Sequence, residues 1–447
     1  MPMTYADRLR RWSALGLLAL VACGGSSTQT TLIGGGLGGG TTANEVDLSV
    51  PTGANTTTIT VDAGPAGGFS IGAVNVPSVT VRICTPGSAT RCVDIDHVFL
   101  DTGSIGLRVF RSAVSTLALP PVAVPADVAS GTLAGNAAEC YPFVLGAVWG
   151  ELATADVQIA GELASGLPVQ LIDDSTPSAE AVPADCAAAA DGQLMNSAAA
   201  LQANGIIGIG MLAYDCGQNC ASGNYSSGYA LYYSCPAGTG SGCSAAALPI
   251  ALQVQNPVTF FPVDNNGTLI AMPALPTLGA EIATGRLVFG IGTQSNNQLP
   301  PTATTLFVDP DPADQSYLYI TTLTGGTSYP DSYIDSGTNA LFFSDATIAQ
   351  SCQSTAGATS AWYCPAAALQ RTATLTDSRG TQVAVSYTVG NADALFSTPG
   401  LAFDDLAGSA PASSSSFVWG LPFFYGRTVY TSIWGQALSP DGPWNAF

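Results

Sequence analysis

A four-residue motif occurs twice in this 447-residue sequence and divides it into two similar halves. The first copy is Asp101-Thr102-Gly103-Ser104 and the second is Asp335-Ser336-Gly337-Thr338, so the two aspartates are 234 residues apart (335 − 101). Each copy ends a β-rich apolar run, and each is followed three residues later by a leucine, Leu107 or Leu341. Either copy alone could be a simple turn, because Asp, Gly and Ser are turn residues. Two copies with matching flanks indicate a repeat of whole lobes.

A second element follows each motif at long range. It consists of two hydrophobic residues and a glycine, Ile206-Ile207-Gly208 in the first half and Val418-Trp419-Gly420 in the second. Elsewhere, short apolar stretches alternate with turn residues, among them 50 Gly and 29 Pro. This alternation of short apolar stretches and turn residues predicts an all-β chain with many turns.

Together, these features resemble the pepsin-like aspartic peptidases. The resemblance covers most of residues 46–447 and implies an all-β, bilobal fold: a double-lobe β-barrel with a central cleft and few short helices. It also implies that Asp101 and Asp335 are the catalytic residues, one from each lobe. The hydrophobic-hydrophobic-Gly strands would thread the two motif loops.

The neighbours of the two aspartates have expected supporting roles in the loops. The threonine and serine that follow the aspartates would brace the loops against each other, as in the family. The glycines allow a tight turn that brings N–H groups near the carboxylates, and the last hydroxyl of each motif can hydrogen-bond the adjacent aspartate. These supporting residues are Thr102, Gly103, Ser104, Ser336, Gly337 and Thr338.

Two adjacent carboxyl groups can hydrolyse a peptide bond without a metal or a cofactor. Like charges about 3 Å apart cannot both ionise, so the pair shares one proton. The ionised member then acts as a base on water, and the protonated member donates to the carbonyl oxygen. This chemistry suits a chain with a single histidine, His97, and we expect no metal and no cofactor. We expect an aspartic endopeptidase acting on polypeptides; a catalytically inactive pepsin-like lipoprotein that binds peptides or envelope partners is the alternative.

The flap of the family carries a tyrosine that hydrogen-bonds a tryptophan, and this sequence departs from that pattern. Aligning residues 149–161 with the second strand of the flap puts Phe143 at the tyrosine position, with Tyr141 two residues earlier on the same strand face. Arg108 stands at the tryptophan position. The link is therefore either missing or rebuilt by Tyr141 and Arg108. All three are candidate flap and substrate-binding residues.

The N-terminal segment has the pattern of a targeting signal. Residues 1–22 combine three arginines with a short apolar run, and Leu20-Val21-Ala22-Cys23 resembles the lipobox of bacterial lipoproteins. This predicts cleavage before Cys23 and a lipid on its thiol; an ordinary signal peptide is the alternative. Residues 23–45 are rich in Gly, Ser and Thr and are expected to form a flexible tether. We therefore expect a protein anchored in the outer membrane of the bacterial cell envelope and facing an oxidising compartment.

Ten cysteines remain after Cys23, an even number typical of disulfide bonding outside the cytoplasm. Metal binding by the cysteines between residues 216 and 243 is the weaker alternative, because their spacing is irregular. Pairing nearest neighbours gives Cys84–Cys92, Cys140–Cys186, Cys216–Cys220, Cys235–Cys243 and Cys352–Cys364.

The remaining predictions concern domains and partners. We expect an N-terminal lobe over residues 46–250, an inter-lobe segment over 251–290 and a C-terminal lobe over 291–447. The formal net charge of −20, with 11 arginines and no lysine, argues against binding to nucleic acid. We expect a monomer that contacts the membrane only through its N-terminal lipid.

Overall fold

The computed structural model describes residues 45–47 and 53–447, except residues 66, 68–72, 128–131, 145, 176–180, 190–192, 224–230, 237–241, 309–317, 351, 353–361, 410–413 and 440–441. The predicted signal peptide, Cys23 and the tether up to residue 44 lie outside the described residues. Within the described part, no helix is long and apolar enough to cross a membrane.

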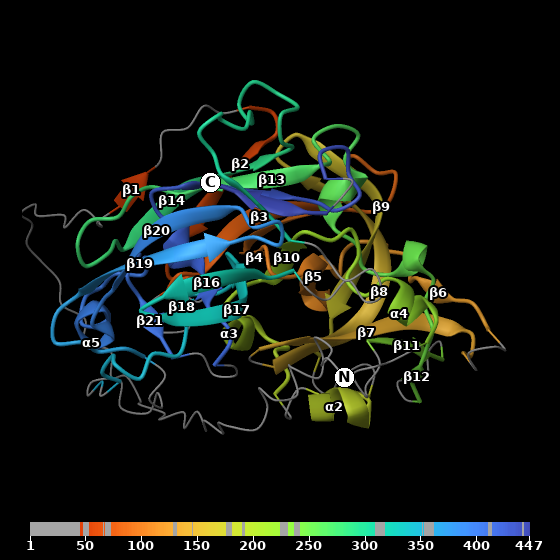
Figure 1. The fold of residues 1–447 in the computed structure, drawn as a ribbon. Helices are drawn as coiled ribbons and strands as arrows, with labels where there is room; N and C mark the ends of the chain where they lie inside the picture. Colours follow the sequence, from red (N-terminus) through yellow and green to blue (C-terminus); the bar gives the residue numbers. More distant parts are fainter. Residues whose placement is uncertain are drawn as a thin grey trace, which may run out of the picture.

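The protein has an all-β double-barrel fold, as the sequence predicts, and the residues described above include four short α-helices (Figure 1). Its strands form one 17-stranded and one 7-stranded sheet. The larger sheet contains β1 (Glu45–Asp47), β2 (Thr56–Val61), β3 (Pro77–Cys84), β4 (Cys92–Asp101), β5 (Ile105–Phe110), β6 (Ala123–Val124), β7 (Gly135–Phe143), β8 (Gly146–Ile159), β9 (Glu162–Ile172), β10 (Gly205–Ile209), β11 (Tyr232–Cys235), β12 (Ser244–Ala245), β13 (Gly267–Ala271), β14 (Ile282–Phe289), β15 (Thr305–Phe307), β23 (Thr428–Ser432) and β24 (Trp444–Ala446).

The smaller sheet lies in the second half of the chain. It contains β16 (Ile320–Thr324), β17 (Thr327–Ile334), β18 (Leu341–Phe342), β19 (Leu369–Thr376), β20 (Gln382–Val389), β21 (Ala407–Gly408) and β22 (Val418–Trp419). The α-helices are α2 (Ala184–Ala189), α3 (Ala198–Leu201), α4 (Gln218–Ala221) and α5 (Ala392–Phe396), and four short 3-10 turns complete the regular structure of the described residues.

The first lobe is a closed barrel. Its hydrogen-bonded ring runs β3–β4–β10–β5–β9–β8 and returns to β3. Alternation of inward apolar and outward polar residues, as along the end of β8, fills the barrel with a core of Val, Ile and Leu. The core of the second lobe is more aromatic: Phe343 stacks on Phe417 at 4.5 Å, and Phe417 on Trp419 at 4.3 Å between ring centroids.

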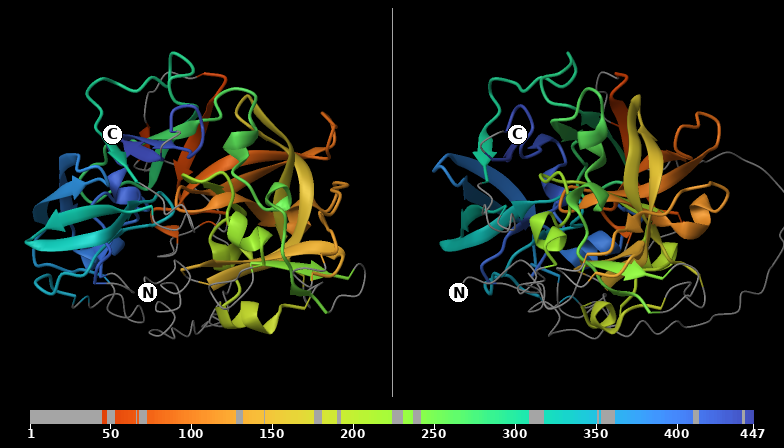
Figure 2. Two further views of the ribbon diagram at one scale, coloured as in Figure 1. Left: turned by 45° about the vertical axis from the view of Figure 1, so that its right-hand side comes forward. Right: turned by 90° about the vertical axis from the view of Figure 1, so that its right-hand side faces the viewer.

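A layer of strands joins the two lobes and draws on both ends of the chain. β2 pairs with β14, β14 with β13, and β13 with β23, which in turn pairs with β24. Figure 2 shows these strands above the orange-to-green first lobe and the cyan-to-blue second lobe. β2 also pairs with β3, so this layer is continuous with the first barrel.

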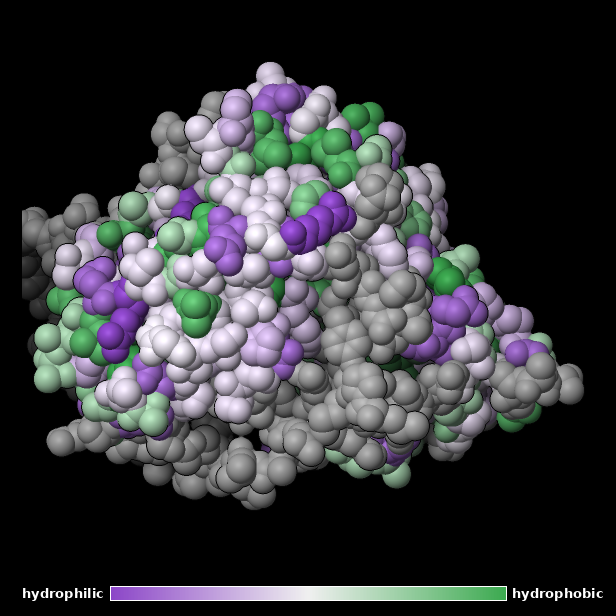
Figure 3. All heavy atoms as spheres, viewed as in Figure 1, coloured by the Kyte–Doolittle hydropathy of each residue, from purple (hydrophilic) through white to green (hydrophobic). Residues whose placement is uncertain are grey.

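All five predicted disulfides are present: Cys84–Cys92, Cys140–Cys186, Cys216–Cys220, Cys235–Cys243 and Cys352–Cys364. They indicate an oxidising compartment such as the periplasm or the cell exterior. On the face shown in Figure 3, most of the described surface is pale, and strongly hydrophilic residues occur only in scattered groups, in keeping with the 9% of charged residues.

Candidate active site

The first aspartate stands where three strands of the first barrel meet. Asp101 is the last residue of β4, and β10 runs parallel to β4 with Gly208 opposite Asp101. On its other edge β10 is antiparallel to β5, which follows the motif loop. A Cβ atom at Gly208 would lie 2.4 Å from the backbone nitrogen of Ile105, so only glycine allows β10 to pass this close to the loop.

The second aspartate has the same setting. Asp335 follows β17, and its N–H donates to the carbonyl oxygen of Trp419 in β22 at 3.0 Å. β22 passes between β17 and β18, and a Cβ atom at Gly420 would lie 2.4 Å from the carbonyl oxygen of Thr338. Both hydrophobic-hydrophobic-Gly elements therefore thread their motif loops as the resemblance implies.

The two loops are hydrogen-bonded to each other across the molecule. The N–H of Thr102 donates to Oγ of Ser336 at 3.2 Å, and the N–H of Ser336 donates to Oγ1 of Thr102 at 2.9 Å. The Ser336 hydroxyl also donates to the carbonyl oxygen of Leu100 at 3.0 Å. Thr102 and Ser336 are both buried, so the bonds form away from competing water.

Each carboxylate is held by donors from its own loop, in the same pattern. The N–H of Gly103 donates to Oδ1 of Asp101 at 2.7 Å, and the Ser104 hydroxyl donates to Oδ2 at 2.5 Å. In the second loop, Gly337 and Thr338 donate to Oδ1 and Oδ2 of Asp335, both at 2.7 Å. The hydrogen bonds predicted from Ser104 and Thr338 are thus present.

The two carboxyl groups lie together, because each one occupies space beside the glycine of the other loop. A Cβ atom at Gly103 would lie 2.8 Å from Oδ1 of Asp335, and one at Gly337 would lie 2.4 Å from Oδ1 of Asp101. Neither glycine has a left-handed backbone, so the close approach of the opposite acid, not the turn itself, requires glycine here.

The shared environment changes the acidity of the pair. Burial, and then the charge of Asp101, raise the pKa of Asp335 to about 8, against the opposing hydrogen bonds from Thr338 and Gly337. Asp101 and Asp335 are 6% and 8% exposed, so both are nearly but not completely removed from solvent. Asp335 therefore keeps its proton up to about pH 8, beside the second carboxyl group of the pair.

The predicted flap corresponds to the hairpin of β7 and β8, in which Tyr141 pairs with Val148 and Phe143 with Gly146. The rings of Tyr141 and Phe143 contact each other with centroids 5.0 Å apart, which confirms that they share a strand face. Arg108 is completely buried, so its predicted part in substrate binding can only be indirect. Its guanidinium carbon lies 3.8 Å from the centre of the Tyr141 ring. The two alternatives were a missing link and a link rebuilt by Tyr141 and Arg108. The direct contact between these two residues favours the rebuilt link.

The sequence did not reveal the partners of Arg108. Glu139 and Asp215 bind it and Tyr232 binds Asp215, and none of the three belongs to a recognisable motif. One signal was available: Arg108 interrupts the otherwise apolar run of residues 105–110, and a buried arginine needs carboxylate partners.

Two surface hollows are present, and neither is lined by Asp101 or Asp335. The larger, of about 450 Å³, is lined by residues such as Asp94, Phe110, Asp174 and Asn204, and the smaller, of about 280 Å³, by residues such as Tyr387, Asp404 and Arg427. The predicted central cleft therefore remains a prediction.

Among the described residues, one group could offer three ligand atoms to a metal: Cys352, Cys364 and Asp393. Both sulfur atoms are used in a disulfide, so this group is not a metal centre.

Comparison with known proteins gives a family but no activity. Residues 51–447 match the family model described as "Protein of unknown function (DUF3443)". No curated protein matches the sequence.

Proposed function

The chain belongs to the DUF3443 family, whose description assigns no function, and from the chemistry of its site we propose that it is an aspartic-type endopeptidase. The pairing of two carboxyl groups from separate halves of the chain carries this proposal. Each is oriented by its own loop, and the raised pKa of Asp335 leaves one proton for the pair. A purely structural turn needs neither the matched donors nor a buried like-charged neighbour.

The reaction follows from the two protonation states. Asp101, ionised, takes a proton from a water molecule as the water oxygen bonds to the carbonyl carbon of the substrate. Asp335, protonated, gives its proton to the carbonyl oxygen, which produces a tetrahedral diol. The proton on Asp101 then passes to the leaving nitrogen as the C–N bond breaks, and Asp335 recovers a proton from a diol hydroxyl. Protons balance over the cycle, and one water is consumed for each bond cleaved.

The compartment fits a protein that acts outside the cytoplasm. The five disulfides support an oxidising location, and the lipobox-like residues before Cys23 support a lipid anchor there. In this proposal, the segment expected from the sequence to be a tether, residues 23–45, would hold the two-lobed domain near a bacterial membrane, where it meets extended polypeptides.

The decisive experiment is hydrolysis of an unfolded polypeptide between pH 3 and pH 8. The folded wild type should cleave it. Asp101→Asn and Asp335→Asn should each lose at least about 1,000-fold in rate, since each removes one of the two proton-transfer groups. Glu281→Gln, which removes a carboxyl group immediately before β14, is the matched control and should keep full activity. A folded protein with five disulfides that cleaves nothing over this range would refute the proposal and favour a peptide-binding protein.

A further inference from the structure

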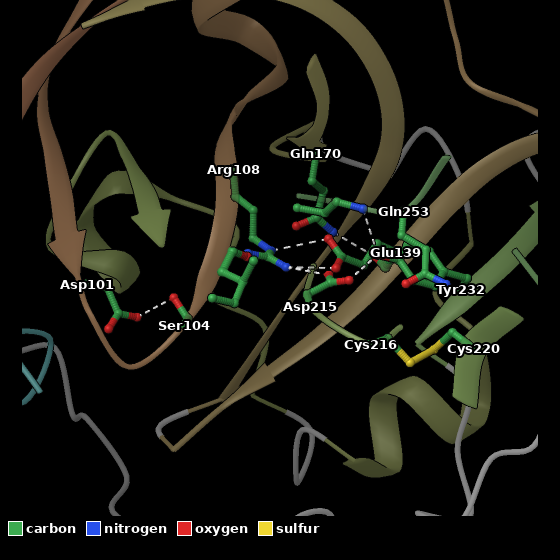
Figure 4. A network of polar contacts seen from close by, with 12 residues as sticks. Asp101, Ser104, Arg108, Glu139, Gln170, Asp215, Cys216, Cys220, Tyr232 and Gln253 are labelled. Carbon is green, nitrogen blue, oxygen red and sulfur yellow. Dashed lines mark hydrogen bonds and ion pairs between the residues drawn. A yellow bond between two sulfur atoms is a disulfide. The ribbon is translucent and has the colours of Figure 1, made fainter. Parts of the chain in front are cut away.

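A buried charge cluster lies beside the candidate active site, within the same lobe. Nε of Arg108 donates to Oε2 of Glu139 at 3.2 Å, and Nη2 donates to Oε1 of Glu139 at 2.8 Å and to Oδ2 of Asp215 at 3.1 Å. Figure 4 shows Arg108 pointing away from Asp101 and Ser104 and into this cluster. The side chains of all three charged residues are completely buried.

The carboxylates of the cluster are themselves anchored. The Tyr232 hydroxyl donates to Oδ1 of Asp215 at 2.6 Å and accepts from the N–H of Val254 at 2.9 Å. Nε2 of Gln170 donates to the carbonyl oxygen of Glu139 at 2.7 Å. Burial, and then the charge of Glu139, raise the pKa of Asp215 well above its usual range, so two acids and one arginine are kept near neutrality.

These contacts fix the plane of the guanidinium group. Nη1 of Arg108 donates to the carbonyl oxygen of Ile105 at 2.6 Å, and Ile105 begins β5 directly after the first motif. Arg108 is therefore bound on one side to the strand that leaves the Asp101 loop and on the others to carboxylates. A bidentate arginine held in this way has little freedom to rotate.

One face of the fixed guanidinium is covered by a ring of the hairpin. Tyr141 lies two residues before the end of β7, and its ring centre is 3.8 Å from the guanidinium carbon. A cation over an aromatic face is attracted by the ring quadrupole, and the attraction is strongest where water is excluded. The contact thus ties the end of the hairpin to the loop that carries Asp101.

We propose that Arg108, locked by Glu139 and Asp215, is a positioning residue that holds the end of the β7–β8 hairpin in register with the Asp101 loop through its contact with Tyr141. This inference rests on the proposed function for its catalytic meaning, because the hairpin is the element that would close over a bound polypeptide. It assigns Tyr141, not Phe143, as the hairpin residue whose position is fixed by contact with Arg108.

The test measures hydrogen exchange in the full, disulfide-bonded chain, without reference to activity. Arg108→Lys keeps the positive charge between the two carboxylates but loses the planar face, and Tyr141→Leu removes the ring from a position that is only half-buried. Each should speed amide exchange in a peptide spanning residues 138–150 about tenfold, and the double variant should exchange no faster than either single variant. Tyr141→Phe retains the ring and should exchange like the wild type.

Three results would overturn the inference. One is unchanged exchange of the hairpin in both single variants, and another is an additive effect in the double variant. The third is an equal rise in β19 and β20 of the other lobe, which would mean general loosening.

A second measurement separates this inference from the proposed function. On a cleaved polypeptide, Arg108→Lys and Tyr141→Leu should lower kcat/KM about tenfold while leaving the pH profile unchanged, because the two aspartates are not altered. A shifted pH profile would contradict a positioning role. If the folded wild type cleaves nothing, the proposed function fails, and the exchange result still decides whether Arg108 positions the hairpin.

Discussion

The raised pKa of Asp335 makes the stability of the protein depend on pH in a way that one substitution should abolish. Below about pH 4 this carboxyl is protonated in both the folded and the unfolded chain, so it has no effect on their balance. Between pH 4 and about 8 the unfolded chain loses the proton and the folded chain keeps it. Stability therefore falls as pH rises through this window, and Asp335→Asn removes that fall.

The size of the effect follows from the two pKa values. Each pH unit inside the window lowers the free energy of unfolding by about 1.4 kcal/mol for one proton. A window of about four units gives an upper limit of roughly 5 kcal/mol at pH 8. Asp335→Asn should thus match the wild type near pH 3 and be more stable by several kcal/mol near pH 8.

Urea unfolding of the oxidised protein at closely spaced pH values measures this difference directly. Asp405 and Glu162, whose pKa values burial raises to about 6 and about 7, add slopes of the same sign to both proteins, and these cancel in the comparison. Asp101→Asn should narrow the pH range over which stability falls, because it removes the charge that is the second cause of the raised pKa of Asp335. Parallel curves for the wild type and Asp335→Asn between pH 4 and 8 would refute the reasoning, whereas Glu281→Gln should follow the wild type.

Three further predictions concern the same site and the disulfides. Gly337→Ala places a Cβ atom 2.4 Å from Oδ1 of Asp101, so urea unfolding should show a loss of about 1–3 kcal/mol together with loss of hydrolysis; unchanged values would contradict the close approach. The rate of hydrolysis should decline on the basic side with a midpoint near pH 8, where Asp335 gives up its proton, and a midpoint below pH 5 would argue against this acid assignment. Replacing both Cys140 and Cys186 by alanine opens a 46-residue separation and should cost about 2–4 kcal/mol by the same unfolding assay, an expectation that fails if the midpoint does not move.

The sequence was informative wherever a local rule repeated itself. The two motifs could be found because each needs a glycine, Gly103 or Gly337, where the opposite aspartate approaches. The two threading strands could be found because each needs a glycine, Gly208 or Gly420, where it passes its motif loop. The disulfides could be paired because four of the five join cysteines no more than 12 residues apart, where short loops bring them together.

Contacts between distant, dissimilar residues could not be predicted in this way. Glu139 and Asp215 are 31 and 107 residues from Arg108. A single acidic residue in a strand or a loop belongs to no sequence pattern from which its partner could be predicted. The pairing of β24 with β15 and β23 is similarly hidden, because three-residue strands have no periodicity to read. In both cases the contact is determined by the tertiary fold and not by the local sequence.

The position of β24 has a consequence for shortened chains. Residues 444–446 hydrogen-bond to β15 and β23 and complete the layer that joins the lobes, although the first aspartate is translated more than 300 residues earlier. A polypeptide that stops before residue 444 lacks the strand that pairs with both β15 and β23, so the edges of these two strands that face β24 are left without hydrogen-bond partners.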